Sequence, residues 1–82
     1  MRNLKAFLRI LAKASRERGM TATQLSKIAS TPIAVVKELL DYGTKKGFFS
    51  QNIEHHQLVY TLTKAGSDFA NYVKGYQEIF VK

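Results

Sequence analysis

The 82-residue sequence contains no cysteine or tryptophan, a single proline and only six acidic residues. Without cysteine the chain cannot form disulfides, and this composition fits a reducing compartment. No apolar run approaches the ~18–20 residues that span a bilayer. The N-terminal stretch is basic and amphipathic, but Lys5, Arg9 and Lys13 interrupt it, so it lacks the continuous apolar segment of a targeting peptide. We therefore expect a cytoplasmic protein that is not bound to a membrane.

Basic residues outnumber acidic residues by 13 to 6, and the formal net charge is +7. Such an excess favours a polyanionic partner, because lysine and arginine neutralise phosphates and release condensed counterions. Charge alone is equally compatible with a soluble basic protein that has no such partner. The length suits one small domain, residues 1–82.

Residues 3–18 have the periodicity of an amphipathic helix. Apolar side chains form one stripe, and basic side chains form a second stripe on another face. Gly19 is expected to end this helix. The basic stripe either contacts backbone phosphates or is a solvated face. The apolar stripe consists of Leu4, Phe7, Leu8, Leu11 and Ala14, and the basic stripe of Arg2, Lys5, Arg9, Lys13 and Arg16.

A capping box predicts the start of a second, short helix. Thr21 precedes Gln24 by three residues, so each side chain can accept a hydrogen bond from the backbone of the other. The helix is expected to end near Ser30. Its inner face consists of Leu25, Ile28 and Ala29.

A third helix is expected over residues 32–46, and the glycine that follows should end it. Pro32 suits the first helical position, because its missing N–H would have no partner there. Thr31 or Ser30 can cap the helix. The glycine on its inner face either permits another helix to approach closely or weakens the last turn. The inner face consists of Ile33, Val36, Leu39, Leu40 and Gly43.

The periodicity then changes to that of a β-hairpin over residues 48–62. The runs "FFSQNI" and "QLVYTL" are rich in β-forming residues, and they flank a tip at residues 52–56. In the second run, Leu58, Tyr60 and Leu62 alternate with Val59 and Thr61, as in a half-buried strand.

The last helix is expected to begin after Thr63 and to run to about Val81. Its aromatic and apolar residues are spaced 4, 3, 4, 3, as in the seam of a coiled coil. We expect residues 63–82 to be a dimerisation element, although the same side chains could pack on the first helix of their own chain. The candidate dimer contacts are Phe69, Tyr72, Val73, Tyr76, Ile79 and Phe80.

With a brief strand near residues 19–21, the elements follow the order α-(β)-α-α-β-β-α. This order predicts a mainly α protein with a small β-hairpin (α+β), the winged helix-turn-helix. The segment "YTLTKAGSDFANYVKGY", residues 60–76, is similar to the strand-end signature of small archaeal winged-helix DNA-binding proteins. That family includes regulators of crenarchaeal viruses and chromatin-type proteins. The resemblance implies a homodimer that binds double-stranded DNA, on the nucleoid or in a host cytoplasm if the protein is viral.

The third helix would lie in the major groove, with the wing on the backbone or in the minor groove. A hydroxyl can bond a base or phosphate, small apolar groups can pack on a thymine methyl, and a carboxylate can accept from a cytosine amino group. The alternative is that these side chains form a solvated helix face. The candidates are Thr31, Ala34, Val35, Lys37 and Glu38 in the groove, Lys27, Lys45 and Lys46 on phosphates, and His55 and His56 at the wing.

No motif indicates catalysis, a cofactor or an effector site. Adjacent histidines in a strand point to opposite faces, so His55 and His56 are not expected to hold a metal ion. The leading function is therefore a homodimeric transcription regulator that binds double-stranded DNA. Two alternatives are a winged helix used for protein–protein assembly and a non-specific, chromatin-type DNA-binding protein.

Overall fold

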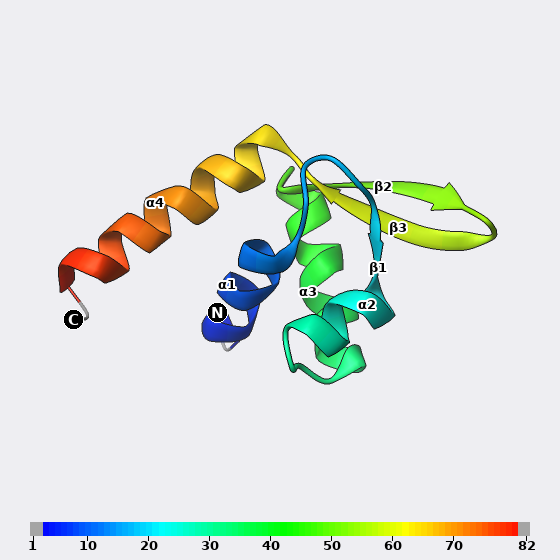
Figure 1. The fold of residues 1–82 in the computed structure, drawn as a ribbon, viewed down its shortest axis with the longest axis horizontal. Helices are drawn as coiled ribbons and strands as arrows, with labels where there is room; N and C mark the ends of the chain where they lie inside the picture. Colours follow the sequence, from blue (N-terminus) through cyan, green and yellow to red (C-terminus); the bar gives the residue numbers. More distant parts are fainter. Residues whose placement is uncertain (1–2, 81–82) are drawn as a thin grey trace.

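A computed structural model of the chain describes the backbone of residues 3–80 and the side chains of residues 3–74. Over this part of the chain, four helices and a three-stranded antiparallel sheet follow one another in the predicted order (Figure 1). The expected α+β class is therefore confirmed. The helices are α1 (Leu4–Lys13), α2 (Ala22–Ile28), α3 (Ile33–Lys45) and α4 (Lys64–Phe80), and the strands are β1 (Met20–Thr21), β2 (Phe49–Glu54) and β3 (Gln57–Leu62).

The sheet has the strand order β1–β3–β2. Met20 pairs with Tyr60, which confirms the brief first strand. β2 and β3 form the wing, a hairpin in which Glu54 pairs with Gln57 across a two-residue turn. Side chains alternate between the two faces of a strand, so one face of the wing continues the surface that covers the helices. This inner face consists of Phe49, Gln51, Ile53, Leu58, Tyr60 and Leu62.

The core lies between the helices and the root of the wing. Phe7, Ile10 and Leu11 of α1 are buried against Leu25 of α2 and Leu40 of α3. Each buried aliphatic or aromatic side chain of this size contributes about 1.5–3 kcal/mol relative to leaving it in water. α1 therefore supports the pair α2–α3 from behind, and the opposite surface of that pair remains exposed.

Gly43 allows the wing to lie directly on α3. A Cβ atom at this position would be only 2.5 Å from Cδ2 of Phe49 on β2, and 3.3 Å from Cε1 of Phe7. Any larger residue would push the Phe49 ring away from the helix. The close approach that the sequence allowed is thus realised, most tightly by Phe49 of a strand and less tightly by Phe7 of α1.

α1 is shorter than predicted, because it ends at Lys13 and not near residue 18. Ala14 has an extended backbone, and the carbonyl of Ser15 accepts a hydrogen bond of 2.8 Å from the N–H of Leu62. This contact with the end of β3 competes with continuation of the helix. Gly19 does not cap the helix and packs instead against Val59, where a Cβ would be 2.8 Å from Cγ2.

The capping box at Thr21 is confirmed, since its hydroxyl accepts from the N–H of Gln24 and the Gln24 side chain accepts from the N–H of Thr21. Two predictions about the inner faces were wrong, because Ile28 and Ile33 are 48% and 40% exposed. Both residues adjoin the α2–α3 turn at the rim of the domain (Figure 1).

α4 begins as predicted, because the Thr63 hydroxyl accepts a 3.0 Å hydrogen bond from the N–H of Gly66. Its first turns pack on the domain, where the rings of Phe69 and Phe48 stack with centroids 4.7 Å apart. The C-terminal half of the helix extends away from the other elements (Figure 1). α4 therefore has a packed half and a projecting half.

Candidate nucleic-acid interface

Arg9 ties α1 to the turn between α2 and α3. Its Nε donates to the carbonyl oxygen of Ala29 at 3.2 Å, and its Nη2 donates to the hydroxyl of Thr31 at 3.4 Å. The Thr31 hydroxyl in turn donates to the Ala29 carbonyl at 2.9 Å. Hydrogen bonds from a charged donor are each worth about 1.5–3 kcal/mol. Arg9, which the sequence placed in the basic stripe, thus holds α2 and α3, the two helices of the helix-turn-helix, in position.

Thr31 corrects the prediction of a groove-facing hydroxyl. The residue is only 5% exposed, and its oxygen is engaged by Ala29 and Arg9. It also does not cap α3, whose N-cap position is Pro32 and has no side-chain cap hydrogen bond. A side chain turned into the protein cannot reach a base, so Thr31 is left out of the interface.

The outward face of α3 carries three of the five charged residues of residues 33–46. Val36, Leu39, Leu40 and Gly43 are buried, and the outward line on the opposite side consists of Ala34, Glu38, Asp41 and Lys45. Lys37 is exposed on the flank of α3 and faces the same groove as Leu58 and Tyr60 of β3.

Two of the predicted contacts on α3 have partners of their own. Lys45 forms an exposed ion pair of 3.1 Å with Asp41, a contact worth at most about 1 kcal/mol and easily exchanged for a phosphate. Val35 is half-buried and packs against the core. The outward line therefore presents Ala34 and Glu38 to a ligand more freely than Val35.

The two remaining lysines occupy different positions. Lys27 is exposed in the last turn of α2. Lys46 lies with its Nζ 5.7 Å from the centre of the Tyr42 ring, in a cleft that Phe48 and Phe69 also line. This cleft is on the flank of α3 that faces α1 and α4. Lys46 therefore lies on a different flank of α3 from the outward line, and its predicted phosphate contact stays a prediction.

The wing tip is narrower than predicted and consists of His55 and His56 alone. Both residues are exposed, and both have a left-handed backbone, with φ of 51° and 63°. Next to them, Ile53 and Leu58 face each other across the hairpin and are 70% and 44% exposed. The sequence placed Leu58 in the half-buried set and gave Ile53 no role, whereas both extend the inner face of the wing beyond the core.

A groove of about 700 Å³ separates the wing from the helix-turn-helix. It lies between the start of α2, the flank of α3 and the inner face of β3. We call it the α2–wing groove. Sequence periodicity gave no indication of it, because residues from three separate segments form its walls. The groove is lined by Thr21, Ala22, Thr23, Gln24, Lys37, Gln57, Leu58 and Tyr60.

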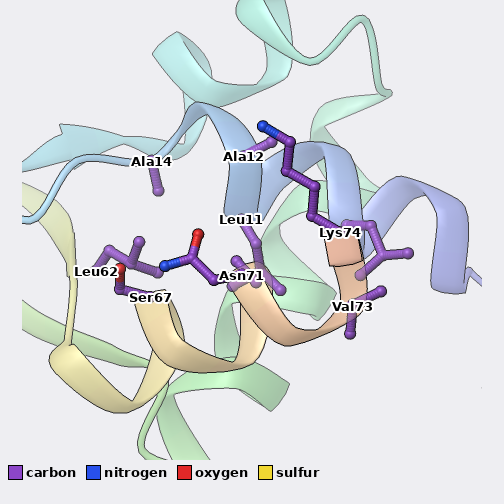
Figure 2. A pocket seen from close by; sticks show the side chains of 10 residues that line it. Leu11, Ala12, Ala14, Leu62, Ser67, Asn71, Val73 and Lys74 are labelled. Atoms are coloured by element: carbon purple, nitrogen blue, oxygen red, sulfur yellow. The ribbon is translucent and has the colours of Figure 1, made fainter. Parts of the chain in front are cut away.

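The predicted dimer contacts on α4 divide into two sets. Phe69 and Val73 are half-buried, Phe69 against Phe48 and Val73 in a hollow of about 480 Å³ between α1 and α4. Figure 2 shows Val73 and Lys74 beside Leu11 in this hollow. Tyr72, in contrast, is 74% exposed. The side chains of Tyr76, Ile79 and Phe80 lie outside the described residues.

Two features of the described residues bear on other classes of function. No helix there is both long enough and apolar enough to cross a membrane. Within the same residues, no three His, Asp or Glu side chains come together as the ligands of a metal ion would.

Known structures share this arrangement of elements. Sso10a-2, a DNA-binding protein from Sulfolobus solfataricus, superposes with a TM-score of 0.82 at 19% identity, over 94% of this chain and 79% of that one. A predicted DNA-binding transcriptional regulator from E. coli gives 0.71 at 20% identity, over 89% and 83%. The MepR–DNA complex of S. aureus gives 0.76 at 15% identity, over 90% and 64%. The sequence itself matches no protein-family model and no curated protein.

These similarities establish the fold, which is the winged helix. The expected fold is therefore confirmed together with the order of its elements. The identities are too low to transfer more than the fold, so an archaeal or viral origin stays a prediction.

Proposed function

We propose that this protein is a transcription regulator that binds double-stranded DNA, with α3 in the major groove and the wing against the adjacent backbone or minor groove. The observation that carries the proposal is the exposed face of α3. It is solvent-facing along its length, while α1 and the Arg9 contacts hold the helix firmly from behind. The net charge of +7 supplies the attraction to phosphates.

Within the groove, we assign base contacts to the outward line and phosphate contacts to the lysines around it. Ala34 is small enough to pack on a thymine methyl, and Glu38 can accept from a cytosine amino group. Lys37, Lys27 and Lys45 neutralise phosphates, Lys45 by exchanging its exposed partner. Val35 contributes only its exposed part.

Two single variants separate these roles. Glu38→Ala should change the preferred sequence recovered from a random pool of duplexes, whereas Lys37→Ala should weaken binding to all duplexes alike. Lys37→Ala should also reduce the slope of log K against log salt concentration by about 0.9. If the wild-type protein binds no duplex at about 50 mM salt, the proposed function is wrong. If Glu38→Ala tightens binding to every duplex equally, the reading role of the carboxylate is wrong.

We further propose that the protein acts as a homodimer through α4. The support is the projecting half of this helix and the 74% exposure of Tyr72, a large aromatic side chain. Two copies would bind two half-sites about one helical turn, ~34 Å, apart. Light scattering should give about twice the chain mass of 9.3 kDa. Tyr72→Glu should yield the monomer, and Asn71→Glu, on the same helix, should not. A wild-type monomer at micromolar concentration would exclude the dimer.

Protein–protein assembly is a second candidate, favoured by two carboxylates on the outward line, Glu38 and Asp41, and by the exposed apolar pair on the wing. A module of this kind would not bind a duplex at low salt. A chromatin-type protein would bind, but would recover no common motif from the random pool. Selection of bound duplexes therefore separates all three functions in one experiment.

A further inference from the structure

The α2–wing groove runs between the two parts of the protein that would enter neighbouring grooves of a duplex. One wall belongs to α2 and α3, and the other is the inner face of β3. Its chemistry has three zones. Leu58 and the ring of Tyr60 provide apolar surface, Thr23 and Gln57 provide polar groups, and Lys37 provides positive charge. The charge of the described lining residues is therefore positive.

The geometry of B-DNA determines what must lie between a helix in the major groove and a wing in the adjacent minor groove. The wall between these two grooves is one sugar–phosphate strand, because each strand separates a major groove from a minor groove. A protein that inserts an element on each side must straddle that strand. The hollow between the two elements must then accommodate deoxyribose rings and phosphates.

From this match we propose that the α2–wing groove is the binding site for one sugar–phosphate strand of the bound duplex. The inference rests on the proposed function and assigns contacts to residues beyond the outward line. Leu58 packs on the apolar faces of deoxyribose, and the Thr23 hydroxyl and Lys37 Nζ bond the flanking phosphates. These contacts read no base, so they add affinity equally for all sequences and set the register of α3 in its groove.

This strand-binding site also assigns a role to the wing, which is to contact sugars and not to neutralise phosphates. Residues 48–62 contain no lysine or arginine and one acid, Glu54. A wing of this kind cannot hold phosphates through its own charges. The exposed Leu58 suits sugar contact instead, and the necessary positive charge stands on the opposite wall, at Lys37. Charge and apolar surface are thus supplied to the same strand from two sides.

Three variants test the proposed strand-binding site by placing a carboxylate on different surfaces. Leu58→Glu puts it on the wing wall of the groove, and Thr23→Glu puts it on the α2 wall, where a first-turn acid is compatible with helix stability. Asn52→Glu is the control, because Asn52 is exposed on the same hairpin but on the face opposite to Leu58. All three variants change the net charge equally. Thermal unfolding checks that each remains folded.

The probe is a fluorescein-labelled duplex of mixed sequence, titrated at low salt. Leu58→Glu and Thr23→Glu should each weaken binding by about tenfold or more, which corresponds to about 1.4 kcal/mol, because a carboxylate beside a phosphate repels it. Asn52→Glu should weaken binding by only a few fold, through net charge alone. Leu58→Ala adds no charge. It should weaken binding by the same factor for every duplex sequence and leave the slope of log K against log salt concentration unchanged.

Two results would overturn the proposal, and they differ. If the wild-type protein and all three carboxylate variants bind with affinities that follow net charge alone, the groove holds no strand while the proposed DNA binding stands. If the wild-type protein binds no duplex, both the proposed function and the proposed strand-binding site are wrong.

Discussion

The turn at the tip of the wing allows the cost of its left-handed backbone to be measured separately from any contact of its side chains with DNA. His55 and His56 have φ values of 51° and 63° in a two-residue hairpin turn, the geometry that favours Asn-Gly. Each non-glycine residue in this region costs at least about 1 kcal/mol, or ~2 kcal/mol for the pair. Replacement by Asn and Gly removes most of this cost, but glycine adds ~0.5–1 kcal/mol of unfolded-state entropy. The double variant His55→Asn/His56→Gly should therefore be more stable by about 1–1.5 kcal/mol.

For a domain of this size, that gain corresponds to a rise in Tm of roughly 4–12 °C in a calorimetric or circular-dichroism melt. The matched control is His55→Ala/His56→Ala, which removes both imidazoles but leaves a Cβ at each strained position, so its Tm should not rise. If the tip contacts DNA, both double variants should bind a duplex more weakly than the wild type. A Tm for the Asn-Gly variant equal to that of the Ala-Ala variant would refute the assignment of strain to the turn.

Three further perturbations test the supporting structure. Gly43→Ala should lower the free energy of unfolding in urea by about 1–3 kcal/mol, because its Cβ would lie 2.5 Å from the Phe49 ring; an unchanged midpoint would show that the ring moves freely. Ser30→Gly should raise the same free energy by several tenths of a kcal/mol or more, because Ser30 has a φ of 50°; a loss of stability would contradict the left-handed turn. Arg9→Ala should weaken DNA binding without changing the slope of log K against log salt concentration, since Arg9 positions the α2–α3 turn. A slope reduced by about 0.9 would instead indicate that Arg9 contacts a phosphate. In that case Lys13→Ala, in the same basic stripe, should reduce the slope by the same amount.

The parts of the fold that local chemistry determines were predictable from sequence. The capping box at Thr21, the Thr63 cap and the glycine after α3 each depend on residues within one turn of the chain, and the structure has all three. Gly47 indeed adopts a left-handed backbone, with φ of 83°. Alternation placed Tyr60 and Leu62 in the buried set for the same reason, since the two-residue period of a strand is a local property.

The failures occur where a distant segment competes with a local preference. The end of α1 depends on a hydrogen bond between Ser15 and Leu62, which are 47 positions apart. Thr31 reads as an exposed cap or DNA contact in sequence, but Arg9 and the Ala29 carbonyl draw its hydroxyl inward. Helical periodicity placed Ile33 inside, but it cannot show whether another element covers the rim of the domain.

The candidate site follows the same division. The sequence by itself determined the order of elements, the excess of positive charge and the presence of Ala34, Lys37 and Glu38 on one helix. Only the tertiary structure decided which side chains remain free for a ligand, because burial depends on contacts between segments far apart in the chain. It turned Thr31 away from the proposed interface, placed Lys46 beside Tyr42, and brought α2, α3 and β3 together around a groove. A groove has no sequence signature, since its walls become neighbours only when the core they share has packed.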